Sequence, residues 1–169
     1  FLERLLFGSA EASDISALPT LIDADGLNNL SQLNDWPQRV VRPLVLTPHP
    51  GEMATLTGLP VNEVQQDRVA VAREWSARWN ACVVLKGANT VIARPDGLVH
   101  VSPFANPGLA SAGTGDVLAG AIAGLLAHDH QGRMRLPVLG PLAHNRPVVQ
   151  TSDRALATRL NGLADLLQS

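Results

Sequence analysis

Apolar residues gather in short continuous runs that alternate with segments of helical spacing. Three runs, each closed by a polar residue, a glycine or a proline, predict buried strands: Leu18–Asp25, Arg42–Pro48 and Ala81–Gly87. The remaining spacing predicts four helices: Leu2–Phe7, Gly26–Leu33, Pro50–Gly58 and Asn62–Trp79. Residues Thr90–Ser102 predict a β-hairpin that turns at Pro95–Gly97. Strands that alternate with helices indicate an α/β sheet that is mainly parallel, with the hairpin near one side.

The segment Asn106–Leu126, NPGLASAGTGDVLAGAIAGLL, predicts a glycine-rich loop and then a helix that begins near Asp116. A helix start attracts phosphate, because its backbone N–H groups are unpaired and carry partial positive charge. Asp116 repels phosphate, so its presence there has two open explanations. It is an N-cap or a favourable acid of the first helical turn. Alternatively, it is a base that accepts the proton of an attacking hydroxyl.

Composition limits the possible classes of protein. The 169 residues are 46% hydrophobic, which suggests one domain over 1–169 with a real core. A net charge of -2 gives no electrostatic case for nucleic acid or for an anionic membrane as a partner. The longest apolar run, around Val117–Ala127, is too short to cross a bilayer. Cys82 is the only cysteine, so no intramolecular disulfide forms and a cytoplasmic location is the default expectation.

Polar residues follow each predicted strand at its carboxyl end, where sheets of this type bind ligands. The residues are Asp23, Asp25, Thr47, His49, Glu52, Lys86 and Thr90. Three of them also have a plain structural interpretation: His49 pairs a backbone group, Glu52 is a first-turn acid and Lys86 extends its stem along a strand end. Asp25 is predicted to cap the helix that follows it. Trp75 and Trp79 are predicted core residues.

Four motifs occur in one order along the chain: DADGLN (Asp23–Asn28), LTPHPGE (Leu46–Glu52), VVLKGANTVI (Val83–Ile92) and NPGLASAGTGDVLAGAIAGLLA (Asn106–Ala127). Together they resemble the ADP- or ATP-dependent NAD(P)H-hydrate dehydratases of the ribokinase-like superfamily. The resemblance runs from about Leu18 to Ala127. It implies a ribokinase-like α/β fold, a mainly parallel sheet flanked by helices.

Two departures from that family pattern stand at the ends of the chain. The family's domain begins before Phe1 with a glycine-rich segment, so we expect this chain to start inside the domain and to lack its N-terminal strands. After Ala127 the family has a continuous helix, whereas Pro137, Pro141 and Pro147 would interrupt one here. Residues Arg154–Leu167 again predict an amphipathic helix.

The resemblance implies repair of NADH and NADPH whose nicotinamide ring has gained water. A phosphoryl group transferred from ADP or ATP, with Mg²⁺, makes the ring hydroxyl a good leaving group. The ring nitrogen's electrons then help to expel phosphate. The partners implied are hydrated NADH or NADPH and the nucleotide, in a homo-oligomer that is in some members fused to or paired with an NAD(P)H-hydrate epimerase.

Site residues also follow from the resemblance, position by position. Asp116 would contact the hydrate and activate its hydroxyl, and His49 would contact the hydrated nicotinamide nucleotide. Glu52 would help to hold Mg²⁺ through water. The anion hole for the moving phosphoryl group would be Gly113, Thr114 and Gly115, with Gly115 also near the nucleotide. The AMP moiety would be lined by Lys86, Gly87, Ala88, Asn89 and Thr90.

Two other functions stay open. Related kinases carry an Asn-x-x-Glu motif, and His49 stands in place of that Asn while Glu52 matches its acid. This difference favours a dehydratase over a ribokinase-like kinase of vitamin precursors, which would form a stable phosphorylated alcohol. A non-catalytic nucleotide-binding fragment is the alternative from a different class.

Overall fold

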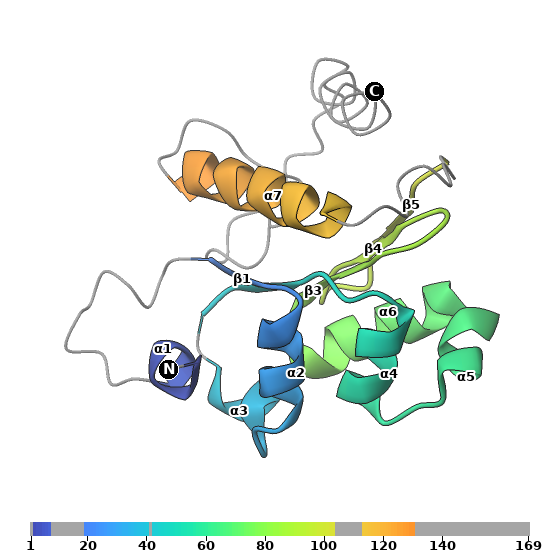
Figure 1. Ribbon diagram of the computed structural model, residues 1–169, viewed down its shortest axis with the longest axis horizontal. Coiled ribbons are helices and arrows are strands. Elements are labelled where there is room, and N and C mark those ends of the chain that lie inside the picture. Colours follow the sequence, from blue (N-terminus) through green and yellow to red (C-terminus); the bar gives the residue numbers. More distant parts are fainter. Residues whose placement is uncertain (1, 8–18, 41, 104–112, 131–169) are drawn as a thin grey trace.

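The computed structural model describes residues 2–7, 19–40, 42–103 and 113–130 (Figure 1). In this part of the chain, five strands form one sheet in the order β1-β2-β3-β4-β5. Strands β1, β2 and β3 run parallel, and β4 and β5 continue the sheet antiparallel. Their bounds are β1 Thr20–Ile22, β2 Leu44–Leu46, β3 Cys82–Leu85, β4 Val91–Ala93 and β5 Val99–Val101.

Helices cover both faces of this sheet. Figure 1 shows α7 on one face and α2, α4 and α6 on the other, so the described residues form three layers. The α/β fold class is confirmed, and the sheet is mixed because the predicted hairpin supplies its antiparallel pairings. The helices are α1 Leu2–Phe7, α2 Asp25–Ser31, α3 Trp36–Arg39, α4 Pro50–Thr57, α5 Val61–Gln66, α6 Arg68–Trp79 and α7 Thr114–His130.

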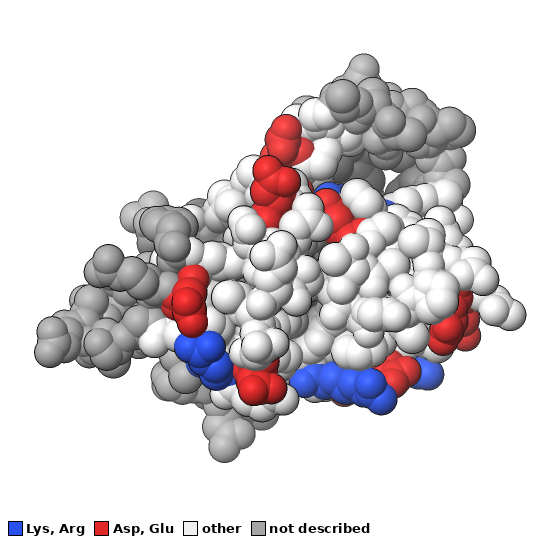
Figure 2. Space-filling model, turned by 60° about the horizontal axis from the view of Figure 1, so that its bottom comes forward, with Lys and Arg blue, Asp and Glu red and all other residues white. Residues whose placement is uncertain are grey.

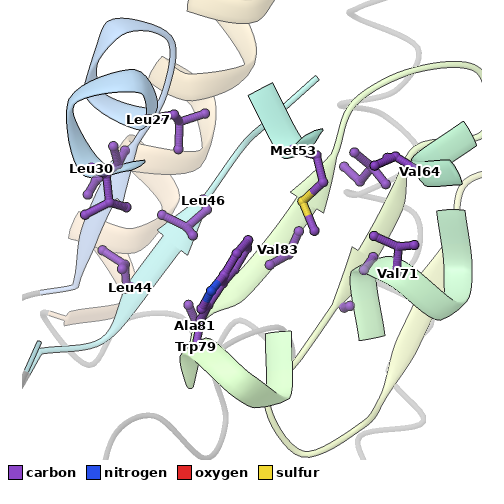
Figure 3. Close-up of a cluster of buried hydrophobic side chains, with 14 of the residues drawn as sticks. Leu27, Leu30, Leu44, Leu46, Met53, Val64, Val71, Trp79, Ala81 and Val83 are labelled. Carbon is purple, nitrogen blue, oxygen red and sulfur yellow. The ribbon is translucent and has the colours of Figure 1, made fainter. Parts of the chain in front are cut away.

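Alternation along the strands divides the core between the two faces. On the face with α2, α4 and α6, Leu44 and Leu46 of β2 lie beside Val83 of β3, and Trp79 of α6 packs among them (Figure 3). On the opposite face, Val45, Cys82 and Val84 pack with Leu126 of α7. Burying one large apolar side chain contributes about 1.5–3 kcal/mol. These contacts therefore fix α7 and α6 on opposite sides of the strands that carry the polar ends.

The prediction of one helix over Asn62–Trp79 is wrong, because α5 ends at Gln66 and α6 begins at Arg68. Asp67 lies between them with φ -141° and ψ 77°, outside the helical region. Its Oδ1 accepts a hydrogen bond of 2.8 Å from the N–H of Ala70. A short acidic side chain that caps a new helix competes with the continuous one. Hydrophobic spacing persists across the break and so conceals it.

The prediction that Asp25 caps a helix is also wrong. The N-cap of α2 is Ala24, with φ 49° and no side-chain capping bond, and Asp25 is the exposed first residue of the helix. Backbone bonds close this turn instead: Gly26 N–H donates to Asp23 O at 3.0 Å, and Leu27 N–H donates to Ala24 O at 2.9 Å. The Asp25 carboxylate therefore acts only as a first-turn acid.

The other predicted elements agree with the structure. Gly58, in the left-handed region at φ 76°, ends α4, and Gly97, at φ 87°, turns the hairpin. Trp79 is buried, and Trp75 packs against the core. The centroids of the two tryptophan rings lie 5.1 Å apart. The short helix α3 has no counterpart among the predictions. The predicted helix over Arg154–Leu167 and the loop before Gly113 lie outside the described residues.

Charged side chains are interspersed on the helical side of the molecule. Figure 2 shows basic and acidic groups side by side along one edge of this face. The ion pairs include Arg39–Glu3 at 3.3 Å and Arg78–Glu74 at 2.7 Å, both with exposed side chains. Exposed pairs of this kind contribute about 0–1 kcal/mol each. Among the described helices, none is long and apolar enough to cross a membrane.

Candidate functional site

A cluster of charged side chains lies at the carboxyl ends of the parallel strands. Asp23 follows β1, Lys86 follows β3, and Glu52 belongs to the first turn of α4 after β2. Lys86 Nζ lies 2.7 Å from Asp23 Oδ1 and 3.8 Å from Glu52 Oε2. The three side chains are only 19%, 11% and 10% exposed for Lys86, Asp23 and Glu52 respectively. We call these three residues the charge cluster.

The charge cluster changes the interpretation of two residues. Lys86 does not simply extend along a strand end, because its ammonium is largely buried between two carboxylates. Such a group needs its partners, since an unpaired buried charge is costly. Asp23 was predicted at the ligand-binding edge of the sheet, directly after the first strand, but no role in the site was predicted for it. The structure brings these two residues together from 63 positions apart.

His49 and Glu52 form a reciprocal capping box at the start of α4. His49 Nδ1 accepts hydrogen bonds from the N–H groups of Gly51, at 2.9 Å, and Glu52, at 3.2 Å. Glu52 Oε2 accepts one from the His49 N–H at 2.7 Å. The interpretations of His49 as a backbone partner and of Glu52 as a first-turn acid are therefore confirmed. Because Nδ1 is an acceptor, the neutral His49 ring carries its proton on Nε2.

The His49 ring remains available to a ligand despite its capping role. Its side chain is 56% exposed, whereas that of Glu52 is 10% exposed. His49 Nε2 lies 3.5 Å from Glu52 Oε1, so this edge of the ring lies beside the buried carboxylate. One residue thus fixes the start of α4 and presents a polar edge to solvent at the same end of the sheet.

The donor set suits Mg²⁺ only through water and ligand oxygens. Carboxylate oxygens are the hard ligands that Mg²⁺ prefers, and this ion is often held by one or two carboxylates together with phosphates and water. Glu52 supplies such a carboxylate, but its oxygens already contact His49 and Lys86. Within the residues that the structure describes, no group of three or more His, Cys, Asp or Glu side chains is arranged to bind a metal directly.

The start of α7 lies directly over the charge cluster. A Cβ built on Gly115 would be 3.5 Å from Lys86 Nζ and 3.8 Å from Asp23 Oδ2. Gly113 precedes the helix at φ 90°, a conformation that favours glycine. Together, Gly113, Thr114 and Gly115 place the positive end of a helix at this edge of the sheet, and the backbone N–H groups of a helix start can bind an anion.

Asp116 is the third residue of α7 and is exposed. The helix begins at Thr114, two residues before the predicted start, so the interpretation of Asp116 as an N-cap is wrong. The two remaining interpretations, a first-turn acid and a general base, are both compatible with this position. An exposed carboxylate in the first turn stabilises the helix and can also reach a bound ligand.

The loop Lys86–Thr90 connects β3 to β4 at the same edge of the sheet. Lys86 N–H donates to Pro48 O at 2.8 Å, and Asn89 Nδ2 donates to Ser102 O at 3.0 Å. Thr90 Oγ1 donates to Gly87 O at 3.1 Å. Residues 87–89 are exposed, with Gly87 at φ 140° and Asn89 at φ 53°. The loop is therefore anchored at both ends and exposed in the middle.

Comparison with known proteins gives one family. The family model that matches residues 10–156 is described as NAD(P)H-hydrate dehydratase. A bifunctional NAD(P)H-hydrate repair enzyme Nnr from Moorella thermoacetica is 51% identical over 108 residues, which are 64% of this chain and 20% of that protein.

Solved structures give the same result. The ADP/ATP-dependent NAD(P)H-hydrate dehydratase of Bacillus subtilis, co-crystallised with ATP and Mg²⁺, matches with a TM-score of 0.57 and 46% identity over 64% of this chain and 37% of that one. A ribokinase-like superfamily protein from Enterococcus faecalis matches with a TM-score of 0.53 and 35% identity over 63% and 36%. The chain thus spans between a fifth and somewhat more than a third of these relatives.

Proposed function

Because the chain belongs to the NAD(P)H-hydrate dehydratase family, we propose that the native protein repairs hydrated NADH and NADPH by nucleotide-dependent dehydration. The observation that carries this proposal is the position of Gly115. It is the second residue of α7 and lies over the Lys86–Asp23 pair, at the end of the sheet that also carries His49 and the Lys86–Thr90 loop. A phosphoryl donor, an anion-binding helix start and a base can all meet there.

The reaction needs a phosphoryl transfer because hydroxide is a poor leaving group. In the proposed sequence, the ring hydroxyl oxygen bonds to the terminal phosphorus of ADP or ATP, and the bond from that phosphorus to the nucleotide's bridging oxygen breaks. The lone pair of the ring nitrogen then expels phosphate. Loss of a ring proton restores the dihydronicotinamide. The sum is hydrate plus ADP giving NADH, AMP and phosphate, or ADP and phosphate when ATP is the donor.

Asp116 is the proposed general base. Its carboxylate is exposed in the first turn of α7, next to the backbone N–H groups that would receive the phosphoryl oxygens. There it accepts the hydroxyl proton as the oxygen attacks, a role that contributes about 10²–10⁴-fold to a rate. Gly113, Thr114 and Gly115 form the proposed anion hole through their backbone N–H groups, and the Lys86 ammonium, paired with Asp23, lies below it.

Two further parts of the site position the substrates. The exposed loop residues Gly87, Ala88 and Asn89, with Lys86 and Thr90 at their ends, line the AMP moiety. The exposed edge of His49 contacts the hydrated nicotinamide nucleotide. Glu52 would help to hold Mg²⁺ through water, and the ion would supply positive charge that offsets the negative charge of the phosphates. We also propose that the protein is a cytoplasmic homo-oligomer. An NAD(P)H-hydrate epimerase would be fused to it or paired with it.

The test is product analysis with the native protein, hydrated NADH, Mg²⁺ and either ADP or ATP. We expect reduced nicotinamide, phosphate and the shortened nucleotide in equal amounts. A phosphorylated product that persists would instead identify a kinase. Binding of the nucleotide without turnover would identify a non-catalytic nucleotide-binding protein.

A matched pair of glycine variants tests the position of the site. Gly115→Val directs a branched side chain toward the Lys86–Asp23 pair, whereas a Cβ at Gly120 of the same helix has none of the described residues within 4 Å. Valine has a somewhat higher helix propensity than glycine, so neither change should be costly through helix propensity alone. We expect Gly115→Val to abolish the rise in melting temperature that ADP produces. Gly120→Val should retain it.

A further inference from the structure

The side chain of Arg68, the first residue of α6, contacts the backbone of the loop Lys86–Thr90 and of Leu85 before it. Its Nη2 donates hydrogen bonds to Leu85 O at 2.9 Å and to Lys86 O at 3.1 Å. Its Nη1 donates to Ala88 O. One planar guanidinium therefore binds three carbonyl groups in a segment of four residues, a geometry that a lysine ammonium cannot reproduce.

These contacts fix the direction of two peptide groups. In a trans peptide the N–H points opposite to the C=O, and the described chain has no cis peptide. Because the carbonyls of Lys86 and Ala88 point toward Arg68, the N–H groups of Gly87 and Asn89 point away from it. Neither N–H has an acceptor within the described residues, whereas the N–H of Lys86 donates to Pro48 O. In the part of the chain that the structure describes, these two backbone donors thus lack an acceptor and lie on the exposed side of the loop.

The surroundings of Arg68 support this arrangement. Asp67 caps α6 and ends α5, which places Arg68 at the helix start beside the loop. A Cβ on Gly87 would lie 3.0 Å from Arg68 Nη2, and φ at Gly87 is 140°. A side chain at this position would therefore press on the guanidinium and strain the backbone.

We propose that Arg68 is a positioning residue for nucleotide binding: it orients the peptides of Lys86–Asn89 so that the Gly87 and Asn89 N–H groups donate to acceptor atoms of the bound nucleotide. The inference rests on the proposed function, since it assumes that this loop lines the AMP moiety. Arg68 itself does not touch the nucleotide. It acts through the backbone, from the opposite side of the loop.

The experiment compares Arg68→Lys and Arg68→Met with Arg73→Met, an exposed arginine of the same helix, in the native protein. The measurements are the dissociation constant of AMP, the melting temperature without ligand, and amide hydrogen exchange at Gly87 and Asn89 with and without AMP. We expect both Arg68 variants to bind AMP about tenfold more weakly, the effect of losing one or two well-oriented hydrogen bonds. Arg73→Met should bind AMP as the wild type does.

The second expectation separates positioning from a merely structural role. Arg68→Lys keeps the charge and most of the stem, so it should recover melting temperature relative to Arg68→Met without recovering AMP affinity. AMP should slow exchange at Gly87 and Asn89 in the wild type and in neither Arg68 variant.

Three outcomes would overturn the inference. It fails if a folded Arg68→Lys or Arg68→Met protein binds AMP with wild-type affinity, or if AMP protects neither amide in the wild type; both results leave the proposed function intact. A wild-type protein that binds neither AMP nor ADP overturns the proposed function, and this inference with it.

Discussion

Lys86 Nζ and Asp23 Oδ1 lie 2.7 Å apart and join the end of β3 to the end of β1 across the end of β2. Lys86 is the single lysine among the 169 residues. Both side chains are mostly buried, so each needs the other to offset the loss of water. The pair also lies beneath Gly115, which connects the stability of the sheet edge with the proposed anion site.

The first prediction follows from this pair. Asp23→Asn should destabilise the protein by about 1–3 kcal/mol, somewhat less than a fully buried pair because some exposure remains. Lys86→Met leaves two carboxylates without their cation and should also destabilise. In a double-mutant cycle measured by urea unfolding, we expect a coupling free energy of about 1 kcal/mol or more. Strictly additive effects would show that the two groups do not depend on each other.

The second prediction separates the two roles of His49. His49→Ala removes the acceptor for the Gly51 and Glu52 N–H groups and should cost about 0.5–2 kcal/mol of stability. His49→Asn keeps a capping acceptor and should restore most of that loss. If His49 also contacts the hydrated nicotinamide nucleotide, His49→Asn should still raise KM for the hydrate. Thermal unfolding and steady-state kinetics measure the two effects.

A control is available in Glu52. Glu52→Gln keeps an acceptor oxygen for the His49 N–H and so retains one half of the capping box. Glu52→Gln removes the buried charge beside Lys86 and leaves the exposed His49 ring in place. Its effects on thermal unfolding and on KM for the hydrate should therefore differ from those of His49→Asn. A wild-type KM in His49→Asn would limit His49 to its capping role.

The sequence predicted the sheet well because its central strands β2 and β3 are buried on both faces. Continuous apolar runs such as Ala81–Gly87 end in polar residues, and those ends meet wherever parallel strands lie side by side. Lys86, His49 and Glu52 were therefore found as a group. Asp116 was predicted near the start of α7, which begins two residues earlier than expected, and its role as a base stays a prediction.

What the sequence could not predict depends on local backbone geometry or on contacts between distant segments. The break at Asp67 keeps the hydrophobic spacing, so periodicity alone does not detect it. Ala24 caps α2 although its side chain has no acceptor, because backbone bonds close the turn. Arg68 resembles a surface charge in the sequence, and only the folded chain brings its guanidinium to the carbonyls of the Lys86–Thr90 loop.

The third prediction concerns Asp116. Asp116→Asn keeps the size of the side chain and removes the base, so turnover of the native protein should fall at least about a hundredfold. AMP and ADP should bind as well as before or better, because a negative charge leaves the anion site. The stability change should stay within about 0.3–1 kcal/mol, the effect of one charge at a helix start. Undiminished turnover would leave Asp116 as a first-turn acid only.

The last prediction uses Cys82, which faces α7 from β3 and is fully buried. Burial raises the pKa of the Cys82 thiol from 9.0 to about 12. The neutral thiol therefore favours the folded state fully below pH 9, and this contribution is lost as the pH rises from 9 toward 12. We expect the free energy of unfolding to fall over this range, with a shallower fall in Cys82→Ala, as measured by urea unfolding at several pH values.

Alkylation of the wild-type thiol at pH 8 should proceed only as fast as the protein opens. Rapid alkylation of the folded protein, or identical pH slopes in the two proteins, would contradict a buried and neutral Cys82.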